Sequence, residues 1–97
     1  LSFREFSIMK DQVTIINTAR GPLIDEKALI QSLQKGKVAG VALDVFENEP
    51  LSQESPLRNF ENCIFGAHNS SNTYEAVMRV NDLAIRNLIS GLNGRDL

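Results

Sequence analysis

Three polar side chains of the kinds that transfer protons or bind anions lie at or just past the ends of apolar stretches: Arg20, Asp44 and His68. An arginine binds a carboxylate through two parallel hydrogen bonds, and a histidine donates and withdraws protons near neutral pH. A carboxylate among apolar residues, such as Asp44, needs a buried hydrogen bond, a ligand contact or exposure at a strand end. These residue types therefore suggest a proton-transfer group beside a carboxylate-binding cation.

An acidic turn, Glu47-Asn48-Glu49-Pro50, offers a partner to the only histidine of the chain. Either Glu47 or Glu49 is able to hold His68 in one tautomer through a hydrogen bond. Each residue also has a plainer interpretation, because surface arginines, turn histidines and solvated acidic loops are common. The pattern indicates an acid/base site with a carboxylate-binding arginine, and it is not unique to one reaction.

Three segments rich in apolar and β-branched residues predict β-strands, at 13–16, 38–45 and 63–67. The first does not alternate in polarity, which is typical of a strand covered on both faces in a parallel sheet. Helical segments between and after the strands indicate an α/β fold with a parallel sheet. Ligands of such sheets bind beyond the carboxyl ends of the strands, so we expect the three polar residues at one rim.

Capping residues predict two helices around the first strand. Ser2, with Glu5 three residues later, begins a helix that we expect to end near residues 10–11. Asp25 is a good N-cap for the next helix, and Gly36 supplies its C-terminal stop.

A long helix is predicted over residues 72–92, with Asn72 as its cap. The polar segment 47–59 is predicted as an ordered loop, because Leu51 and Leu57 offer apolar anchors. The side chains expected on the buried face of the long helix are Val77, Val80, Leu83, Ala84 and Leu88.

Composition limits the class of protein. The chain has 97 residues, of which 42% are hydrophobic and 23% charged, with a formal net charge of −2. This balance gives no electrostatic footprint for nucleic acid or an anionic membrane, and no stretch approaches the roughly 20 apolar residues of a membrane span. The single cysteine, Cys63, excludes an internal disulfide and a four-cysteine zinc site. We therefore expect no metal site and a cytoplasmic location. Because Leu1 is not an initiator methionine, we also expect that sequence precedes it.

Three segments together resemble one known family. INTARGPLIDE (16–26), LDVFENEP (43–50) and the stretch 67–76 are similar, in order and spacing, to signatures of the D-isomer-specific 2-hydroxyacid dehydrogenases. That family includes D-3-phosphoglycerate, D-lactate, glyoxylate/hydroxypyruvate and formate dehydrogenases. The resemblance covers about residues 1–92. It implies that residues 1–97 are the C-terminal part of a dinucleotide-binding domain, a partial Rossmann fold with the last three strands and their helices.

The resemblance also implies roles for individual residues. Arg20 resembles the arginine that binds the substrate carboxylate and the reacting carbonyl oxygen, and His68 resembles the general acid/base. Glu49, by its distance from Arg20, resembles the carboxylate partner of that histidine, which makes Glu47 the weaker candidate. Asp44 resembles the carboxylate near the nicotinamide carboxamide. The full set of cofactor-binding residues implied in this way is Thr18, Ala19, Arg20, Asp44, His68 and Ser70.

The chain departs from the family pattern at two places and lacks one motif. Ala67 stands where proline is usual, and residues 69–71 read Asn-Ser-Ser where the loop is often glycine-rich. No G-x-G-x-x-G phosphate-binding fingerprint occurs in the chain. The resemblance therefore places the phosphate and ribose contacts upstream of Leu1, and NAD rather than NADP is an expectation from the family.

The function that the resemblance implies is hydride transfer between NAD(H) and a 2-hydroxy or 2-keto acid. The full-length parent is expected to be a homodimeric enzyme, and the isolated chain is expected to be inactive. One alternative is a non-enzymatic NAD-sensing module, since the C-terminal-binding-protein corepressors resemble the same family. Another is a folded segment without function, whose first strand exposes an open edge and would favour self-association.

Overall fold

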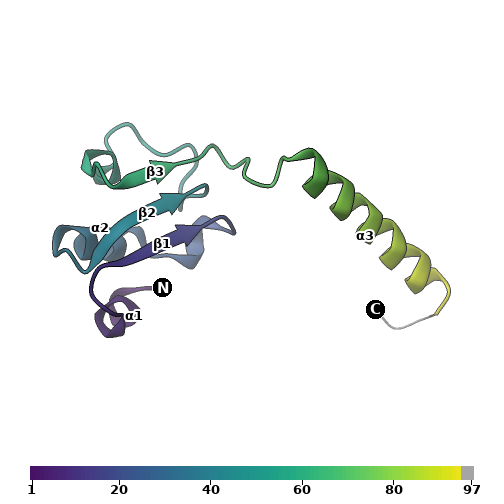
Figure 1. Cartoon of the computed structure of the whole chain (residues 1–97), viewed down its shortest axis with the longest axis horizontal. Coiled ribbons are helices and arrows are strands. Elements are labelled where there is room, and N and C mark those ends of the chain that lie inside the picture. Colours follow the sequence, from purple (N-terminus) through teal and green to yellow (C-terminus); the bar gives the residue numbers. More distant parts are fainter. Residues whose placement is uncertain (95–97) are drawn as a thin grey trace.

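A three-stranded parallel sheet forms the centre of the computed structural model, which describes residues 1–94 (Figure 1). Its strands are β1 (Val13–Asn17), β2 (Val38–Leu43) and β3 (Cys63–Phe65), in the order β1-β2-β3. Both strand pairs are parallel. This arrangement confirms the predicted α/β fold with a parallel sheet.

Two helices, α1 (Phe3–Ile8) and α2 (Glu26–Gln34), complete the body around the sheet (Figure 1). Helix α2 packs on β2 and α1 packs on α2. Burial of apolar side chains between these elements supplies the main stabilisation of the fold. The core contains Phe6, Ile15, Ile24, Ala28, Leu29, Leu33, Val38, Val41, Leu43, Phe46 and Leu57.

Local signals position α2 as predicted. The Asp25 carboxylate accepts a hydrogen bond from the Ala28 backbone N–H at 3.0 Å, which satisfies one free donor at the start of the helix. Gly36 ends the helix with a φ of 69°, in the left-handed region that favours glycine. The helix that begins after Ser2 is shorter than predicted, because Met9 adopts an extended backbone immediately after Ile8.

The predicted coverage of both sheet faces is wrong for the described residues. Ile15 is buried, but Ile16 is 71% exposed and Ile64 is 73% exposed. Helix α2 covers one face, and no element within residues 1–94 covers the other. The second and third strands also end two residues earlier than predicted, at Leu43 and Phe65. Beyond these ends, backbone N–H groups of Phe46 and Asn69 donate to side-chain carboxylates rather than to a neighbouring strand.

Helix α3 (Tyr74–Leu92) projects away from the sheet after an irregular connection (Figure 1). Its cap is Thr73 rather than the predicted Asn72: the Thr73 hydroxyl oxygen accepts a hydrogen bond from the Ala76 backbone N–H at 3.2 Å. The predicted buried face is wrong here, since none of its residues is buried. The connection carries α3 beyond reach of the core. Within residues 1–94, no apolar side chains of another element pack against Val77, Val80, Leu83, Ala84 and Leu88.

The loop after β2 is ordered by apolar anchors, as predicted. Leu57, in the short helix η2 (Pro56–Asn59), is completely buried, and Leu51 packs against the core. The adjacent strand requires glycine at Gly40, where a Cβ would lie 2.9 Å from the Asn62 carbonyl oxygen. Within the part of the chain that the structure describes, no helix has the length and apolar character to cross a membrane.

Candidate functional site

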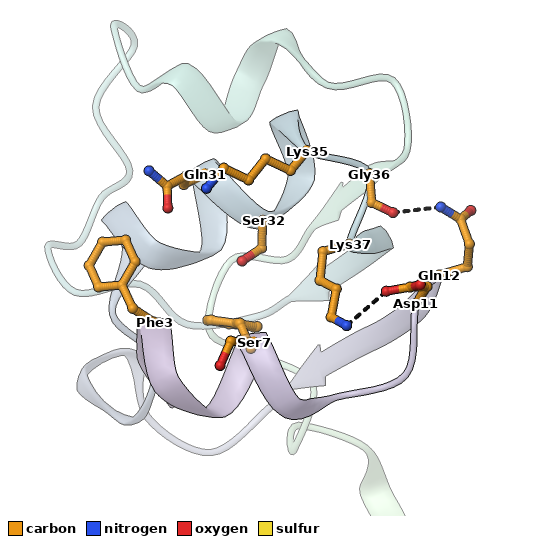
Figure 2. Close-up of a pocket in the computed structure, with 10 residues that line it drawn as sticks. Phe3, Ser7, Asp11, Gln12, Gln31, Ser32, Lys35, Gly36 and Lys37 are labelled. Carbon is orange, nitrogen blue, oxygen red and sulfur yellow. Dashed lines mark hydrogen bonds and ion pairs between the residues drawn. The ribbon is translucent and has the colours of Figure 1, made fainter.

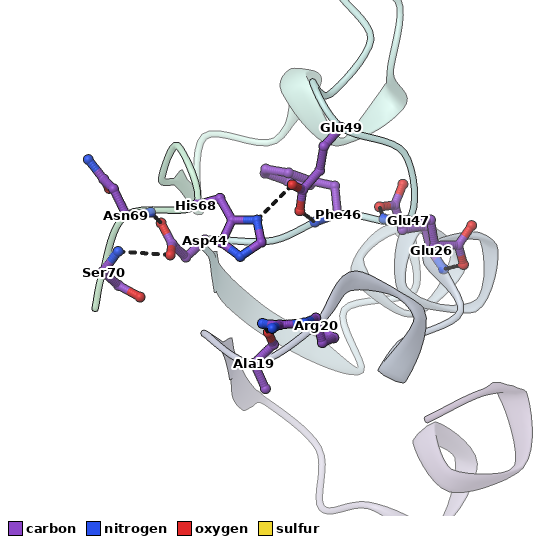
Figure 3. A network of polar contacts seen from close by, with 10 residues as sticks. All are labelled: Ala19, Arg20, Glu26, Asp44, Phe46, Glu47, Glu49, His68, Asn69 and Ser70. Carbon is purple, nitrogen blue, oxygen red and sulfur yellow. Dashed lines mark hydrogen bonds and ion pairs between the residues drawn. The ribbon is translucent and has the colours of Figure 1, made fainter. Parts of the chain in front are cut away.

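The carboxyl ends of the three strands meet at one rim, and the predicted site residues gather there (Figure 3). Arg20 lies on the turn after β1, Asp44 directly follows β2, and His68 lies on the turn after β3. The parallel order of neighbouring strands brings these three turns to the same edge. The structure therefore places the predicted residues side by side, while their chemical roles stay predictions.

His68 contacts Glu49, the acid suggested by the family resemblance. The His68 Nδ1 and the Glu49 Oε2 lie 2.8 Å apart, and the other carboxylate oxygen accepts a hydrogen bond from the Phe46 backbone N–H at 3.0 Å. Both oxygens are thus engaged, which fixes the orientation of the carboxylate. The hydrogen bond with His68, and then that with Phe46, lowers the pKa of the Glu49 carboxyl.

Glu47 has a different place, although the sequence of the turn left both acids open. Its carboxylate accepts a hydrogen bond from the Glu26 backbone N–H at 2.9 Å. The Glu26 carboxylate in turn accepts a hydrogen bond from the Glu47 backbone N–H at 2.7 Å (Figure 3). Glu47 therefore joins the loop after β2 to the start of α2, and it is not the acid in contact with His68.

The buried carboxylate of Asp44 is satisfied by the loop after β3. It accepts hydrogen bonds from the backbone N–H groups of Ser70 at 2.9 Å and Asn69 at 3.2 Å. The hydrogen bond from Ser70 is the largest cause of the lowered pKa of Asp44, and burial acts in the opposite direction. Gly66 is required beside it, since a Cβ there would lie 2.2 Å from the Asp44 Oδ1.

His68 itself adopts a backbone conformation that the sequence did not indicate. Its φ is 56°, in the left-handed region that few residues other than glycine occupy. The His68 backbone N–H donates to the Asp44 carbonyl oxygen at 2.9 Å, which holds the residue in this conformation. Strained backbone of this kind concentrates at functional sites, so this conformation supports His68 as a candidate functional residue.

The turn that carries Arg20 is shaped by Asn17, a buried residue that the sequence did not single out. The Asn17 side chain donates to the Arg20 carbonyl oxygen at 2.9 Å and accepts from the Ala19 backbone N–H at 3.1 Å. Asparagine at a strand end commonly forms such turns, which is the signal that would have identified it. Arg20 makes no ion pair with a carboxylate within residues 1–94, so its guanidinium remains available to an anion.

A cavity of about 540 Å³ opens beside His68 and Glu49. Phe46 and Phe65 form its aromatic wall, with ring centroids 5.7 Å apart in an edge-on arrangement. Arg58 also lines this cavity and braces the loop after the cis Glu49-Pro50 peptide bond. Its guanidinium donates to the carbonyl oxygens of Leu51 and Ser52, both at 2.8 Å. Sequence reasoning missed Arg58, because no local pattern distinguishes it from a surface arginine.

A second cavity, of about 490 Å³, lies away from the rim between α1, α2 and the turn before β1 (Figure 2). Two pairs of its polar groups contact each other: Lys37 pairs with Asp11 at 2.7 Å, and Gln12 donates to the Gly36 carbonyl oxygen at 2.5 Å. None of the predicted site residues lines it. Among residues 1–94, no group of three or more histidine, cysteine or acidic side chains is arranged to hold a metal ion.

The rim residues fit the nicotinamide end of a dinucleotide. Each Asp44 oxygen uses one acceptor position on a backbone N–H and keeps further acceptor capacity for a carboxamide NH₂. Thr18 and Ala19, on the turn after β1, and Ser70, on the loop after β3, border the same edge. The phosphate-binding glycine motif is absent from this sequence, so the chain carries residues suited to only one end of such a cofactor.

Comparison with protein families and curated relatives gives a consistent result. The family model described as D-isomer specific 2-hydroxyacid dehydrogenase, NAD binding domain, matches residues 1–70. A glyoxylate reductase of Thermofilum pendens is 50% identical over 86 residues, which cover 89% of this chain and 25% of that protein. A probable 2-ketogluconate reductase of Dictyostelium discoideum is 45% identical over 93 residues, covering 96% and 28%. The chain thus spans about a quarter of the length of these relatives.

Solved structures agree on the fold. A glyoxylate reductase from Paecilomyes thermophila aligns with a TM-score of 0.79 and 45% identity, over 100% of this chain and 30% of that one. A D-isomer specific 2-hydroxyacid dehydrogenase from Xanthobacter autotrophicus, solved in complex with NADPH and MES, aligns with a TM-score of 0.78 and 32% identity. That alignment covers 97% of this chain and 30% of the other. The partial Rossmann fold expected from the sequence is thereby confirmed.

Proposed function

The chain belongs to the D-isomer specific 2-hydroxyacid dehydrogenase family, within its NAD-binding domain, and on this premise we propose that the whole protein reduces a 2-keto acid with a nicotinamide cofactor. The observation that carries the proposal is the 2.8 Å contact between His68 and Glu49 at the rim that also holds Arg20. A histidine oriented by a carboxylate beside an available guanidinium is the arrangement that a 2-keto acid requires.

Arg20 binds and orients the substrate in this proposal. Its planar guanidinium pairs with the substrate carboxylate through two hydrogen bonds, and its positive charge stabilises the negative charge that develops on the neighbouring carbonyl oxygen. The Asn17 side chain supports this role by fixing the turn on which Arg20 lies.

His68 donates the proton in the direction of reduction. Glu49 accepts a hydrogen bond from Nδ1, which leaves Nε2 as the nitrogen that delivers a proton to the developing alkoxide oxygen. Glu49 also stabilises the positive charge of the imidazolium before transfer. The reverse reaction uses the same groups, with His68 as the base that removes the proton from the hydroxyl.

When bound, the reduced nicotinamide supplies the hydride that the keto carbon accepts. Asp44 would accept a hydrogen bond from its carboxamide, and Thr18, Ala19 and Ser70 would hold the ring. Backbone N–H groups of Asn69 and Ser70 hold the Asp44 carboxylate in place for this contact. We propose NAD(H) as the cofactor from the family description, and NADPH is the alternative that kinetics must test.

The substrate, assembly and location are also proposals. Relatives bear the names glyoxylate, 2-ketogluconate and glyoxylate/hydroxypyruvate reductase, so small 2-keto acids of these kinds are the first candidates, and D-3-phosphoglycerate chemistry is a further one. We propose a homodimer and a cytoplasmic location for the whole protein, to be checked by light scattering and by cell fractionation. We expect the 97-residue chain alone to be inactive, because it lacks the phosphate-binding motif.

The test is oxidation of NADH or NADPH by the whole protein with glyoxylate, hydroxypyruvate and 2-ketogluconate. We expect turnover with at least one of these acids and a preference for one nucleotide. NADH binding without turnover on any 2-keto acid would refute the enzymatic function and favour a non-enzymatic NAD-sensing module.

A further inference from the structure

The proposed reaction requires Arg20 and His68 to contact the same small molecule, yet the two residues lie on different loops. Arg20 lies on the turn between β1 and α2, and His68 is oriented by Glu49 from the loop after β2. Within residues 1–94, no hydrogen bond or ion pair joins the Arg20 side chain to His68 or to Glu49. The sheet brings the turns to one edge, and contacts beyond the strand ends then adjust the separation of the two groups.

A reciprocal pair of hydrogen bonds joins the loop after β2 to the start of α2, the helix that follows the turn carrying Arg20 (Figure 3). The Glu47 carboxylate accepts from the Glu26 backbone N–H at 2.9 Å, and the Glu26 carboxylate accepts from the Glu47 backbone N–H at 2.7 Å. Each side chain thus reaches the main chain of the other residue, and the two residues lie in the first turn of α2 and in the loop after β2. Both bonds are exposed to solvent, and each ends on a backbone N–H, so together they join the two main chains directly.

A steric contact beside the pair fixes the same two loops. Gly21, next to Arg20, packs against the Phe46 carbonyl group so closely that a Cβ would lie 1.8 Å from its oxygen. The Phe46 backbone N–H donates to Glu49, whose other oxygen contacts His68. An unbroken series of contacts therefore leads from the Arg20 turn to the His68 ring.

We propose that Glu26 and Glu47 are positioning residues, which set the distance between Arg20 and the Glu49–His68 pair. This inference rests on the proposed function and extends it to two residues that touch neither substrate nor cofactor. The alternative is that Glu47 only caps α2. Capping explains why Glu47 accepts from the Glu26 backbone N–H, a free donor that the Asp25 cap on Ala28 leaves unused. It does not explain the second bond, in which the Glu47 backbone N–H donates to the Glu26 carboxylate.

Kinetics of the whole protein separate the two roles. Glu47→Ala removes the acceptor, Glu47→Gln keeps a side-chain carbonyl oxygen at the same position, and Glu26→Ala removes the reciprocal acceptor independently. Because a misplacement of about 1 Å costs up to about a hundredfold in rate, we expect both alanine variants to lower kcat/KM for the 2-keto acid by about 10- to 100-fold. The glutamine variant should retain most of the activity.

The matched control is Glu54→Ala, an acid in the same loop whose carboxylate makes no hydrogen bond among residues 1–94. We expect it to leave kcat/KM unchanged. The proposal is overturned if Glu47→Ala and Glu26→Ala retain the parent kcat/KM, or if Glu47→Gln is as impaired as Glu47→Ala. KM for the nucleotide should change little, because neither variant alters a residue proposed to contact the nucleotide.

A second measurement decides the inference even if the whole protein reduces no 2-keto acid. Nitrogen NMR of the histidine-labelled whole protein, with the His68 signals assigned by their loss in His68→Gln, reports the tautomer and environment of the His68 ring. Glu47→Ala and Glu26→Ala should shift both ring nitrogens, with Glu47→Gln and Glu54→Ala close to the parent chain. Unchanged ring signals in both alanine variants, with helix content retained by circular dichroism, would show that the two acids do not position His68.

Discussion

Replacement of Gly21 by alanine tests the contact between the two site loops most sharply. The added Cβ would lie 1.8 Å from the Phe46 oxygen, 2.0 Å from its carbonyl carbon and 2.6 Å from the Glu47 nitrogen. All three atoms belong to the backbone, so no side chain can rotate away. Ordinary van der Waals contact begins at 3.4 Å, so the Gly21 and Phe46 backbones would have to move apart by about 1.6 Å to accommodate the Cβ.

Two effects of this substitution follow from the geometry. Overpacking of this kind costs about 1–3 kcal/mol, so the urea midpoint of the 97-residue chain should fall. A displacement of that size between the loops also exceeds the tolerance of a catalytic arrangement, and kcat/KM of the whole protein should fall by about a hundredfold.

The matched control for Gly21→Ala is Gly91→Ala in α3, where a Cβ meets nothing within 4 Å. Alanine is the better helix former by about 1 kcal/mol, so this variant should be neutral or slightly more stable. Urea unfolding followed by circular dichroism measures both. A Gly21→Ala chain as stable as the parent, with full activity in the whole protein, would refute the close approach of the loops.

Three further predictions concern the core, the carboxylates and the arginine. Leu57→Ala should destabilise the chain by about 2–5 kcal/mol in urea unfolding, whereas alanine at the exposed Leu23 should cost less than about 0.5 kcal/mol. Since hydrogen bonds lower the folded pKa of Asp44 and Glu49, their stabilisation is full above the ordinary carboxyl values and is lost as pH falls through the lowered values. Asp44→Asn should make the urea midpoint less sensitive to pH in that acidic range, and an unaltered pH dependence would contradict the assignment. Arg20→Lys should raise KM for the 2-keto acid by about 10- to 100-fold, the equivalent of a lost charge-assisted hydrogen bond, and an unchanged KM for the 2-keto acid would contradict the role of Arg20.

The elements that short-range signals determine were predictable from the sequence. Asp25 and Gly36 act within one turn of their own helix, so their effects need no tertiary knowledge. The rim followed from the parallel order of buried strands, because that order places consecutive strand ends at one edge. The anchor at Leu57 was visible as an apolar residue in a polar loop.

The features that depend on distant partners were not predictable. The apolar stripe of α3 suggests burial, but burial depends on what lies beside the helix, and within residues 1–94 nothing does. The Glu26–Glu47 pair joins two loops that are remote in sequence, and neither residue carries a local signal of that contact. The left-handed backbone of His68 likewise arises from the loop closure onto Asp44 rather than from residue type.

The partner of His68 could not be chosen between Glu47 and Glu49 from residue types alone. Residue types alone left both acids open as partners of His68, and the family resemblance favoured Glu49. In the structure Glu49 lies 2.8 Å from the His68 ring and Glu47 bonds to the main chain of α2. Glu49 therefore faces His68, whereas Glu47 faces the start of α2.

The most direct test of the central claim is the effect of His68→Gln on the whole protein, which keeps a polar side chain but removes the titrating group. Loss of a general acid/base should lower kcat with the best 2-keto acid by about a hundredfold to ten-thousandfold, with the variant saturated with NADH as judged by fluorescence. A kcat within about threefold of the unmodified protein would contradict the assignment of His68 as the proton donor.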